Sequence, residues 1–233
     1  MKLAIMQPYF FPFIGYWQLI HAVDIFVIYD DVSYIKRGWI NRNRILLNNE
    51  PYLFSISCKK SSQNKLINEI ELALDSRLQN KLFKTFEHAY IKAPFYKEIA
   101  CFLKELFGYK DDNLSNFLTN LIQQVCYYLN ISTTILKSSD KYHCNKGMDK
   151  ADRLIDITKN EGADYYINPI GGQSLYDKQY FFKKGICLSY LVPNIVKYRQ
   201  FSDKFTPNLS IIDVLMFNSK KDVFKMLNDY SLI

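Results

Sequence analysis

The sequence predicts an α/β protein with a Rossmann-like three-layer sheet that is interrupted by a helical insertion. Three observations favour this class: strand and helix patterns alternate at the front, helical periodicity fills the middle, and the alternation returns afterwards. With 233 residues and 48% hydrophobic content, the chain is long enough to bury a sizeable core. We therefore expect a single domain over residues 1–233.

The front of the chain has the size of a βαβ unit. Residues 3–6 form a short apolar run that ends at Gln7-Pro8, which predicts a buried strand. Pro12 is suited to the first turn of a helix, and apolar residues then follow at helical spacing as far as Val23. Residues 24–29 predict a second buried strand, so the unit spans about 30 residues.

The next segments predict a hairpin and then the insertion. Two apolar runs, 44–47 and 52–56, flank turn residues and favour a β-hairpin. From about residue 66 to residue 129 the apolar residues recur at helical spacing, with breaks at 93–94 and 108–115. This stretch predicts three or more helices whose apolar stripes form core.

The last third of the chain returns to alternation. Residues 131–136 predict a third strand, and residues 149–159 predict an amphipathic helix that ends at Gly162. Residues 165–167 and 186–190 predict the last strands, with a short helix between them.

Composition restricts the function classes. Five cysteines are an odd number without C-x-x-C spacing, so we expect buried thiols and neither a disulfide framework nor a metal site. The apolar start is too short for a secretory signal, and no run reaches about 18 apolar residues, so we expect a cytoplasmic protein without a membrane span. The net charge of +7 suits an anionic partner, with a passive lysine-rich surface as the alternative.

The first candidate binding segment, residues 7–15, lies between the first strand and the first helix. Its prolines stiffen the loop, its glutamine amide both donates and accepts, and a helix start favours anions. The predicted binding residues are Gln7, Pro8, Tyr9, Phe11 and Gly15. The alternative is an aromatic loop that closes the end of the sheet.

The second candidate segment, residues 30–44, combines forked donors for phosphate with aromatic rings for stacking. The predicted binding residues are Tyr34, Lys36, Arg37, Trp39, Asn41, Arg42 and Arg44. Asp30 and Asp31 follow a strand, at the sheet edge where ligands bind, and are the candidate catalytic bases. They would form ion pairs with the nearby arginines in preference to binding a divalent metal, and a surface hairpin with Trp39 tucked inward is the alternative to a site.

The third candidate region consists of residues 146–153 and 168–173. Both segments lie between a predicted strand and a predicted helix, where glycine backbone can approach a ligand closely. Gly171 and Gly172 are the predicted binding residues, and a simple turn is the alternative.

Four stretches of this sequence carry a resemblance to a known family. They are MQPYFFPFIGYWQLI, DIFVIYDDVSYIKRGWINRNRI, DRLIDI with the following GADYYI and GG, and FTPNLSIIDVL. Through them nearly the whole chain resembles the WbqC-like family of bacterial polysaccharide gene clusters. The resemblance implies a role in O-antigen or lipopolysaccharide biosynthesis: transfer of an amino-acid-derived group, such as glycyl, to the amine of a nucleotide-linked amino sugar.

In that interpretation, Lys36, Arg37, Arg42 and Arg44 hold the diphosphate, and Trp39 or Tyr34 stacks on the base or the sugar. The acyl donor stays open between a charged tRNA, an acyl-CoA and an ATP-activated acid, and no cofactor is identified. DNA is not expected as a partner. The competing interpretations are a tRNA- or nucleotide-binding module and a non-catalytic scaffold of a sugar-assembly complex.

Overall fold

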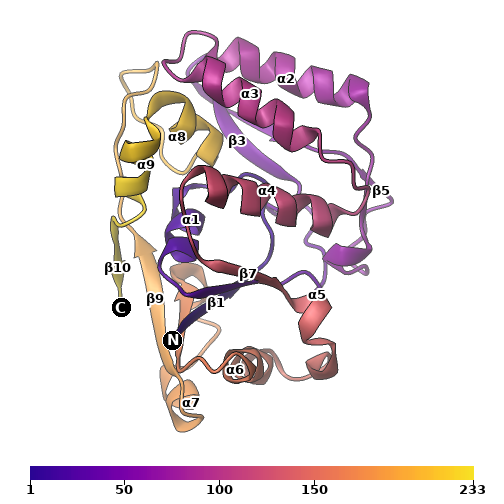
Figure 1. The fold of residues 1–233 in the computed structure, drawn as a ribbon, viewed down its shortest axis with the longest axis vertical. Helices are drawn as coiled ribbons and strands as arrows, with labels where there is room; N and C mark the ends of the chain where they lie inside the picture. Colours follow the sequence, from indigo (N-terminus) through magenta and orange to yellow (C-terminus); the bar gives the residue numbers. More distant parts are fainter.

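The computed structural model describes residues 1–233 and contains a six-stranded, mostly parallel sheet (Figure 1). Its strands are β1 (Lys2–Met6), β2 (Ile25–Ile28), β7 (Thr134–Lys137), β8 (Tyr165–Pro169), β9 (Cys187–Pro193) and β10 (Tyr230–Leu232). The order is β10-β9-β8-β1-β2-β7, and only β10 runs antiparallel to its neighbour. The predicted Rossmann-like α/β class is confirmed.

Successive strand residues point to opposite sides of the sheet, and here the residues on both sides are apolar. Helices therefore cover both faces. Leu3, Ile5 and Val27 belong to a core cluster shared with α6 (Lys150–Asn160) and α7 (Lys178–Lys183). Ala4, Phe26 and Ile28 belong to a larger cluster of 45 buried residues, which includes α1 (Ile14–His21) and the helices of the insertion. The sheet is therefore the middle of three layers.

The predicted hairpin is present as β3 (Arg42–Leu47) and β4 (Glu50–Ser55). Asn48 and Asn49 form its turn with φ angles of 51° and 64°. Asparagine tolerates this left-handed backbone better than most residues, which explains why the chain reverses here. Phe54 contacts Phe86, with ring centroids 5.2 Å apart, and so fixes the hairpin against the insertion.

The insertion contains α2 (Ser76–Tyr90), α3 (Tyr96–Phe107) and α4 (Leu114–Tyr128), between β2 and β7 of the sheet. It begins later than residue 66. Residues 67–69 form a 3₁₀ turn, and β6 (Glu71–Leu72) pairs with β5 (Cys58–Lys59). The Asp75 carboxylate accepts a hydrogen bond from the Leu78 amide, and this N-cap sets the start of α2.

Three elements at the C-terminus were not predicted: α8 (Ile211–Phe217), α9 (Lys220–Met226) and β10. Two of them are helices of seven residues, too short for periodicity to reveal. Strand β10 has three residues, too few for a period-two pattern to be recognised, and it pairs antiparallel with β9.

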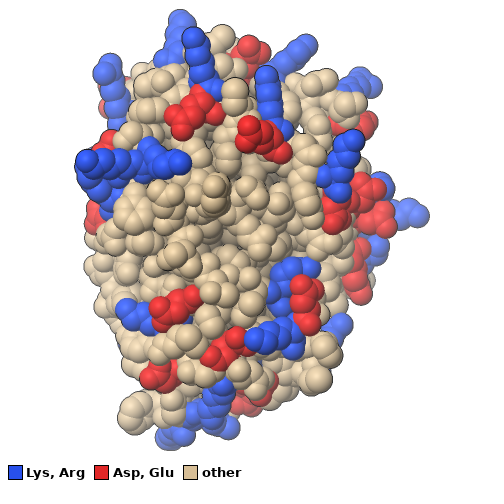
Figure 2. All heavy atoms as spheres, in the orientation of Figure 1, with Lys and Arg blue, Asp and Glu red and all other residues tan.

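Charged side chains are unevenly distributed on the face shown in Figure 2. Lys, Arg, Asp and Glu surround a central area that carries few of them, and this area lies over α4. The sequence of α4 contains no charged residue. None of the helices combines the length and the apolar character needed to cross a lipid bilayer.

The expectation of buried thiols was wrong for most of the five cysteines. Only Cys126 is buried, Cys58 is intermediate, and Cys101, Cys144 and Cys187 are exposed. Burial raises the pKa of the Cys126 thiol to about 12 and that of Cys58 to about 11. The exposed three lie on α3 (Cys101), in the 3₁₀ turn of residues 143–145 (Cys144) and at the start of β9 (Cys187).

Candidate functional site

The strand order reverses beside β1, and the sheet opens at this point. β1 pairs with β2 over four residues as far as Met6, but it pairs with β8 only at Lys2 and Leu3. The carboxyl ends of β1 and β8 therefore diverge. In doubly wound sheets, the crevice at such a reversal is the usual place for a ligand.

Asn168 supplies an unpartnered polar group at the end of β8. The residue is 5% exposed, and its amide nitrogen Nδ2 has no hydrogen-bond partner. A Cβ atom on Gly172 would lie 2.1 Å from this nitrogen, so only glycine permits the arrangement. A buried donor left unpaired costs about 1–3 kcal/mol, which makes Asn168 a candidate to bind an acceptor on a ligand.

Asp30, at the end of β2, is fully buried and surrounded by donors. Its carboxylate accepts hydrogen bonds from the hydroxyls of Ser115, Ser138 and Ser139 and from the Ser139 amide at 3.0 Å. Lys137 Nζ lies 3.7 Å from Oδ2. Ser139 and Lys137 are half-buried, so these two side chains connect the buried carboxylate with the surface.

Asp31 forms a buried ion pair with Arg153 of α6, and both side chains are less than a tenth exposed. Arg153 also donates to Asn145 Oδ1 at 2.8 Å and to the Tyr29 hydroxyl at 3.2 Å. Ser138 Oγ lies within hydrogen-bond distance of both carboxylates, closer to Asp31 than to Asp30, and so its single hydroxyl bridges them.

The aspartates thus form ion pairs, but the predicted partners were wrong. Arg153 and Lys137 take the place that we expected for the arginines of residues 37–44. The physical reason is topology: α6 and the end of β7 lie at the same sheet edge as Asp30 and Asp31, whereas the chain after Asp31 leads away to the hairpin. Action of either carboxylate as a base stays a prediction.

The first two candidate segments lie against each other. The Phe10 amide donates to the Trp39 carbonyl at 2.9 Å. The Asn43 side chain donates to the carbonyls of Phe10 and Phe11 at 3.0 and 2.8 Å. Residues 31–43 therefore cover the loop that follows β1.

Two of the four predicted phosphate-binding cations have no protein partner. Lys36 and Arg37 are exposed, and neither forms an ion pair. Arg42 donates through Nε to the Gly38 carbonyl at 3.0 Å and also binds the Arg37 carbonyl, so it closes the loop. Arg44 stacks over the Trp39 ring at 5.3 Å.

Several other predicted binding residues contact the protein itself. Phe11 stacks on Phe107, and the Tyr34 hydroxyl donates to Asn41 at 2.9 Å. A Cβ on Gly15 would lie 2.5 Å from the Phe13 ring and 2.6 Å from Pro193, so this glycine is packed against its own loop and strand β9. Their part in binding a ligand stays a prediction.

The remaining predicted residues lie in the loop after β1 and just beyond the carboxyl end of β8. Gln7 and Tyr9 are half-buried, Pro8 is buried, and burial raises the pKa of the Tyr9 hydroxyl. Gly171 is exposed, whereas Gly172 is buried against Asn168. No group of three or more His, Cys, Asp or Glu side chains is placed to hold a metal ion.

The three serines that donate to Asp30 were not predicted from the sequence. Lys137, Ser138 and Ser139 follow a predicted strand just as Asp30 and Asp31 do, so the same sheet-edge signal was available for them. Ser115 gave no such signal, because it lies at the start of α4 and 85 residues from Asp30.

A second buried carboxylate lies on α8. Asp213 accepts hydrogen bonds from the hydroxyls of Tyr90 at 2.7 Å and Tyr198 at 2.6 Å, and from Gln200 at 3.1 Å. Burial raises its pKa, although these donors oppose the rise. The preceding Ser210 donates to the Phe11 carbonyl at 2.8 Å, which attaches this region to the front loop.

Comparison with known proteins gives two matches. The model of the WbqC-like protein family matches residues 7–224. "Uncharacterized protein Rv1507c" of Mycobacterium tuberculosis is 30% identical over 233 residues, an alignment that covers 93% of each chain. No solved structure gives a significant match.

Proposed function

The chain belongs to the WbqC-like protein family, and from this premise we propose that it transfers an acyl group to the amine of a nucleotide-linked amino sugar. The acyl group would be amino-acid-derived, such as glycyl, and the product would serve O-antigen or another surface polysaccharide. The reaction would take place in the cytoplasm.

The observation that carries the proposal is the pair of free cations beside an aromatic ring. Lys36 and Arg37 are exposed without a carboxylate partner, and Trp39 is 39% exposed. A diphosphate requires such cations, and a nucleobase requires a ring on which to stack. The Phe10–Trp39 hydrogen bond holds this loop over the end of β1, beside the opening of the sheet.

The opening between β1 and β8 would receive the sugar. Asn168 offers its unpartnered amide to a sugar hydroxyl or to the oxygen of the acyl group, and Gln7 flanks it at the end of β1. Sugars present many hydroxyls, and neutral amides both donate to them and accept from them.

The chemistry needs one base. The sugar amine attacks the carbonyl carbon of an activated ester or thioester, and the C–N bond forms. The bond from that carbon to the leaving group breaks, and the leaving group departs with the electron pair as an alkoxide or thiolate, which takes up the proton that the amine gives to Asp30. The amine loses a proton, which passes to the Ser139 hydroxyl as Ser139 gives its own proton to Asp30, 2.8 Å away. Asp31 and Arg153 would hold the shared Ser138 in place.

Titration calorimetry with UDP- and dTDP-linked amino sugars tests the binding step. The variant Lys36→Gln/Arg37→Gln is expected to bind at least about tenfold more weakly, because hydrogen bonds to charged groups contribute about 1.5–3 kcal/mol each. Lys159→Gln/Lys183→Gln removes two exposed charges elsewhere and should retain the affinity. Equal affinities for all three proteins would exclude the phosphate-binding role.

Turnover of Ser139→Ala tests the proton path. With the sugar that binds, and with the donor that supports transfer, Ser139→Ala should lose about 10²- to 10⁴-fold in turnover while its affinity stays unchanged. Ser139→Thr keeps the hydroxyl and should recover most of the rate. A normal rate for Ser139→Ala would contradict transfer of the proton through this residue.

A further inference from the structure

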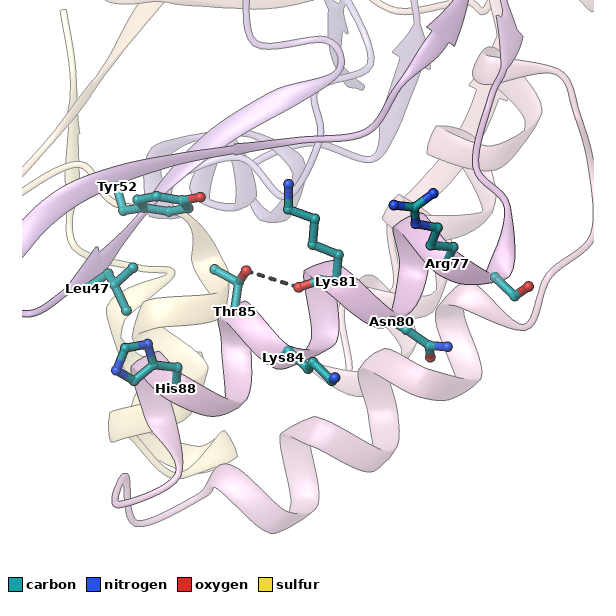
Figure 3. Close-up of a pocket in the computed structure, with 9 residues that line it drawn as sticks. Leu47, Tyr52, Arg77, Asn80, Lys81, Lys84, Thr85 and His88 are labelled. Carbon is teal, nitrogen blue, oxygen red and sulfur yellow. Dashed lines mark hydrogen bonds between the residues drawn. The ribbon is translucent and has the colours of Figure 1, made fainter.

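A groove separates the β3–β4 hairpin from α2, on a part of the molecule that the proposed reaction does not use. Its volume is about 730 Å³, within the usual range of ligand sites. It is lined by Leu47, Tyr52, Ser76, Arg77, Asn80, Lys81, Lys84, Thr85 and His88 (Figure 3). We infer that this groove binds a segment of single-stranded nucleic acid.

The first argument is the row of cations along α2. Arg77, Lys81 and Lys84 follow one another at spacings of four and three residues, which places them along one side of the helix. None of them forms an ion pair, and no acidic residue lines the groove. In Figure 3 the side chains of Arg77 and Lys81 extend from α2 toward the hairpin.

The second argument is the aromatic ring on the opposite wall. Tyr52 lies on β4, is 42% exposed and faces the groove above α2 (Figure 3). The ring of Tyr52 is therefore open to stacking. Proteins that bind single strands combine a cationic groove along the backbone with aromatic side chains on which bases stack.

The length of the row of cations favours a single-stranded nucleic acid over a mononucleotide. Arg77 and Lys84 are seven residues apart, which corresponds to about 10 Å along a helix. A single phosphate contacts only one point of such a row, whereas consecutive phosphates of a strand follow it. An acidic peptide would satisfy the cations but would leave Tyr52 without a stacking partner.

The inference does not depend on the nucleotide-sugar proposal. None of the groove residues belongs to the loops at the carboxyl ends of the strands. If the acyl donor is a charged tRNA, the groove would hold a single-stranded part of that donor. If the donor is a small molecule, nucleic-acid binding would be a separate activity.

Fluorescence anisotropy of a labelled 12-nucleotide RNA with the full chain tests the charged wall. Removal of two cations in Arg77→Gln/Lys81→Gln should make the slope of log K against log salt shallower by about 1.4, at about 0.7 per cation. The control Lys97→Gln/Lys104→Gln removes two exposed charges from α3 and should keep the original slope. An equal decrease of the slope in both variants would mean non-specific electrostatic attraction and would overturn the inference.

The aromatic wall is tested with the same RNA. Tyr52→Ala should bind about 5- to 150-fold more weakly, the range expected for one stacked base, and Tyr52→Phe should bind normally. Displacement of the RNA by poly-glutamate or by a mononucleotide at equal phosphate or carboxylate concentration would overturn the assignment to a strand. The same variants should bind the nucleotide sugar normally, so failure of this inference and failure of the proposed function are distinguishable.

Discussion

Replacing Arg153 with methionine is expected to lower the free energy of unfolding by about 3–5 kcal/mol. The substitution removes the partner of Asp31 while the carboxylate stays buried, with only 4% of its side chain exposed. It also removes the donors to Asn145 and to the Tyr29 hydroxyl. Urea unfolding followed by circular dichroism measures the loss.

The matched control is the double variant Asp31→Asn/Arg153→Met. Once the buried charge is gone, most of the lost stability should return, because the main cost is the unpaired carboxylate and not the lost attraction. A loss below about 1 kcal/mol in Arg153→Met alone would mean that water reaches Asp31 and that the pair behaves as a surface salt bridge.

Asp213→Ala is expected to cost about 3–5 kcal/mol as well. The substitution leaves the buried hydroxyls of Tyr90 and Tyr198 without their acceptor, and each unpaired donor costs about 1–3 kcal/mol. The Gln200 amide loses one acceptor and keeps the Thr206 carbonyl. The control Tyr198→Phe removes one donor together with its need for an acceptor, so its loss should be much smaller. A loss in Asp213→Ala no larger than that of Tyr198→Phe would contradict the shared-acceptor arrangement.

The same carboxylate predicts how stability depends on pH. Burial raises the pKa of Asp213 above its unfolded value of about 3.9, so the folded protein binds this proton more tightly than the unfolded chain does. Its contribution to stability is therefore complete below about pH 3.9 and is lost as the pH rises through the folded pKa. The asparagine of Asp213→Asn does not titrate. The difference in unfolding free energy between this variant and the wild type should therefore change between about pH 3.9 and the folded pKa of Asp213. A constant difference from pH 4 to pH 8 would exclude the raised pKa.

The sequence predicted the local part of the site and missed the part made by distant contacts. The βαβ front, the hairpin with its asparagine turn and the position of Asp30 and Asp31 at the sheet edge follow from periodicity and turn chemistry. The partners of those aspartates do not: Ser115 is 85 residues from Asp30, and Arg153 is 122 residues from Asp31. Such pairings depend on strand order, which hydrophobic patterns do not encode.

The errors at element boundaries have local causes. The helical insertion begins at Ser76 because Asp75 caps it, although apolar residues at helical spacing start ten positions earlier. Trp39 and Tyr34 have the same aromatic character in the sequence, yet one is 39% exposed and the other 3%. Tertiary contacts distinguish them: Tyr34 belongs to the large core cluster and donates to Asn41, whereas Trp39 lies outside that cluster with Arg44 over its ring.

The hydroxyl of Ser115 connects the helical insertion to the sheet. By donating to Asp30, the first turn of α4 completes a buried site at the edge of the sheet. Excision of residues 76–128 would therefore remove a donor from a fully buried carboxylate as well as a layer of core. We therefore expect β2, α4 and the end of β7 to unfold as one cooperative unit, so that their backbone amides exchange with solvent through a shared opening.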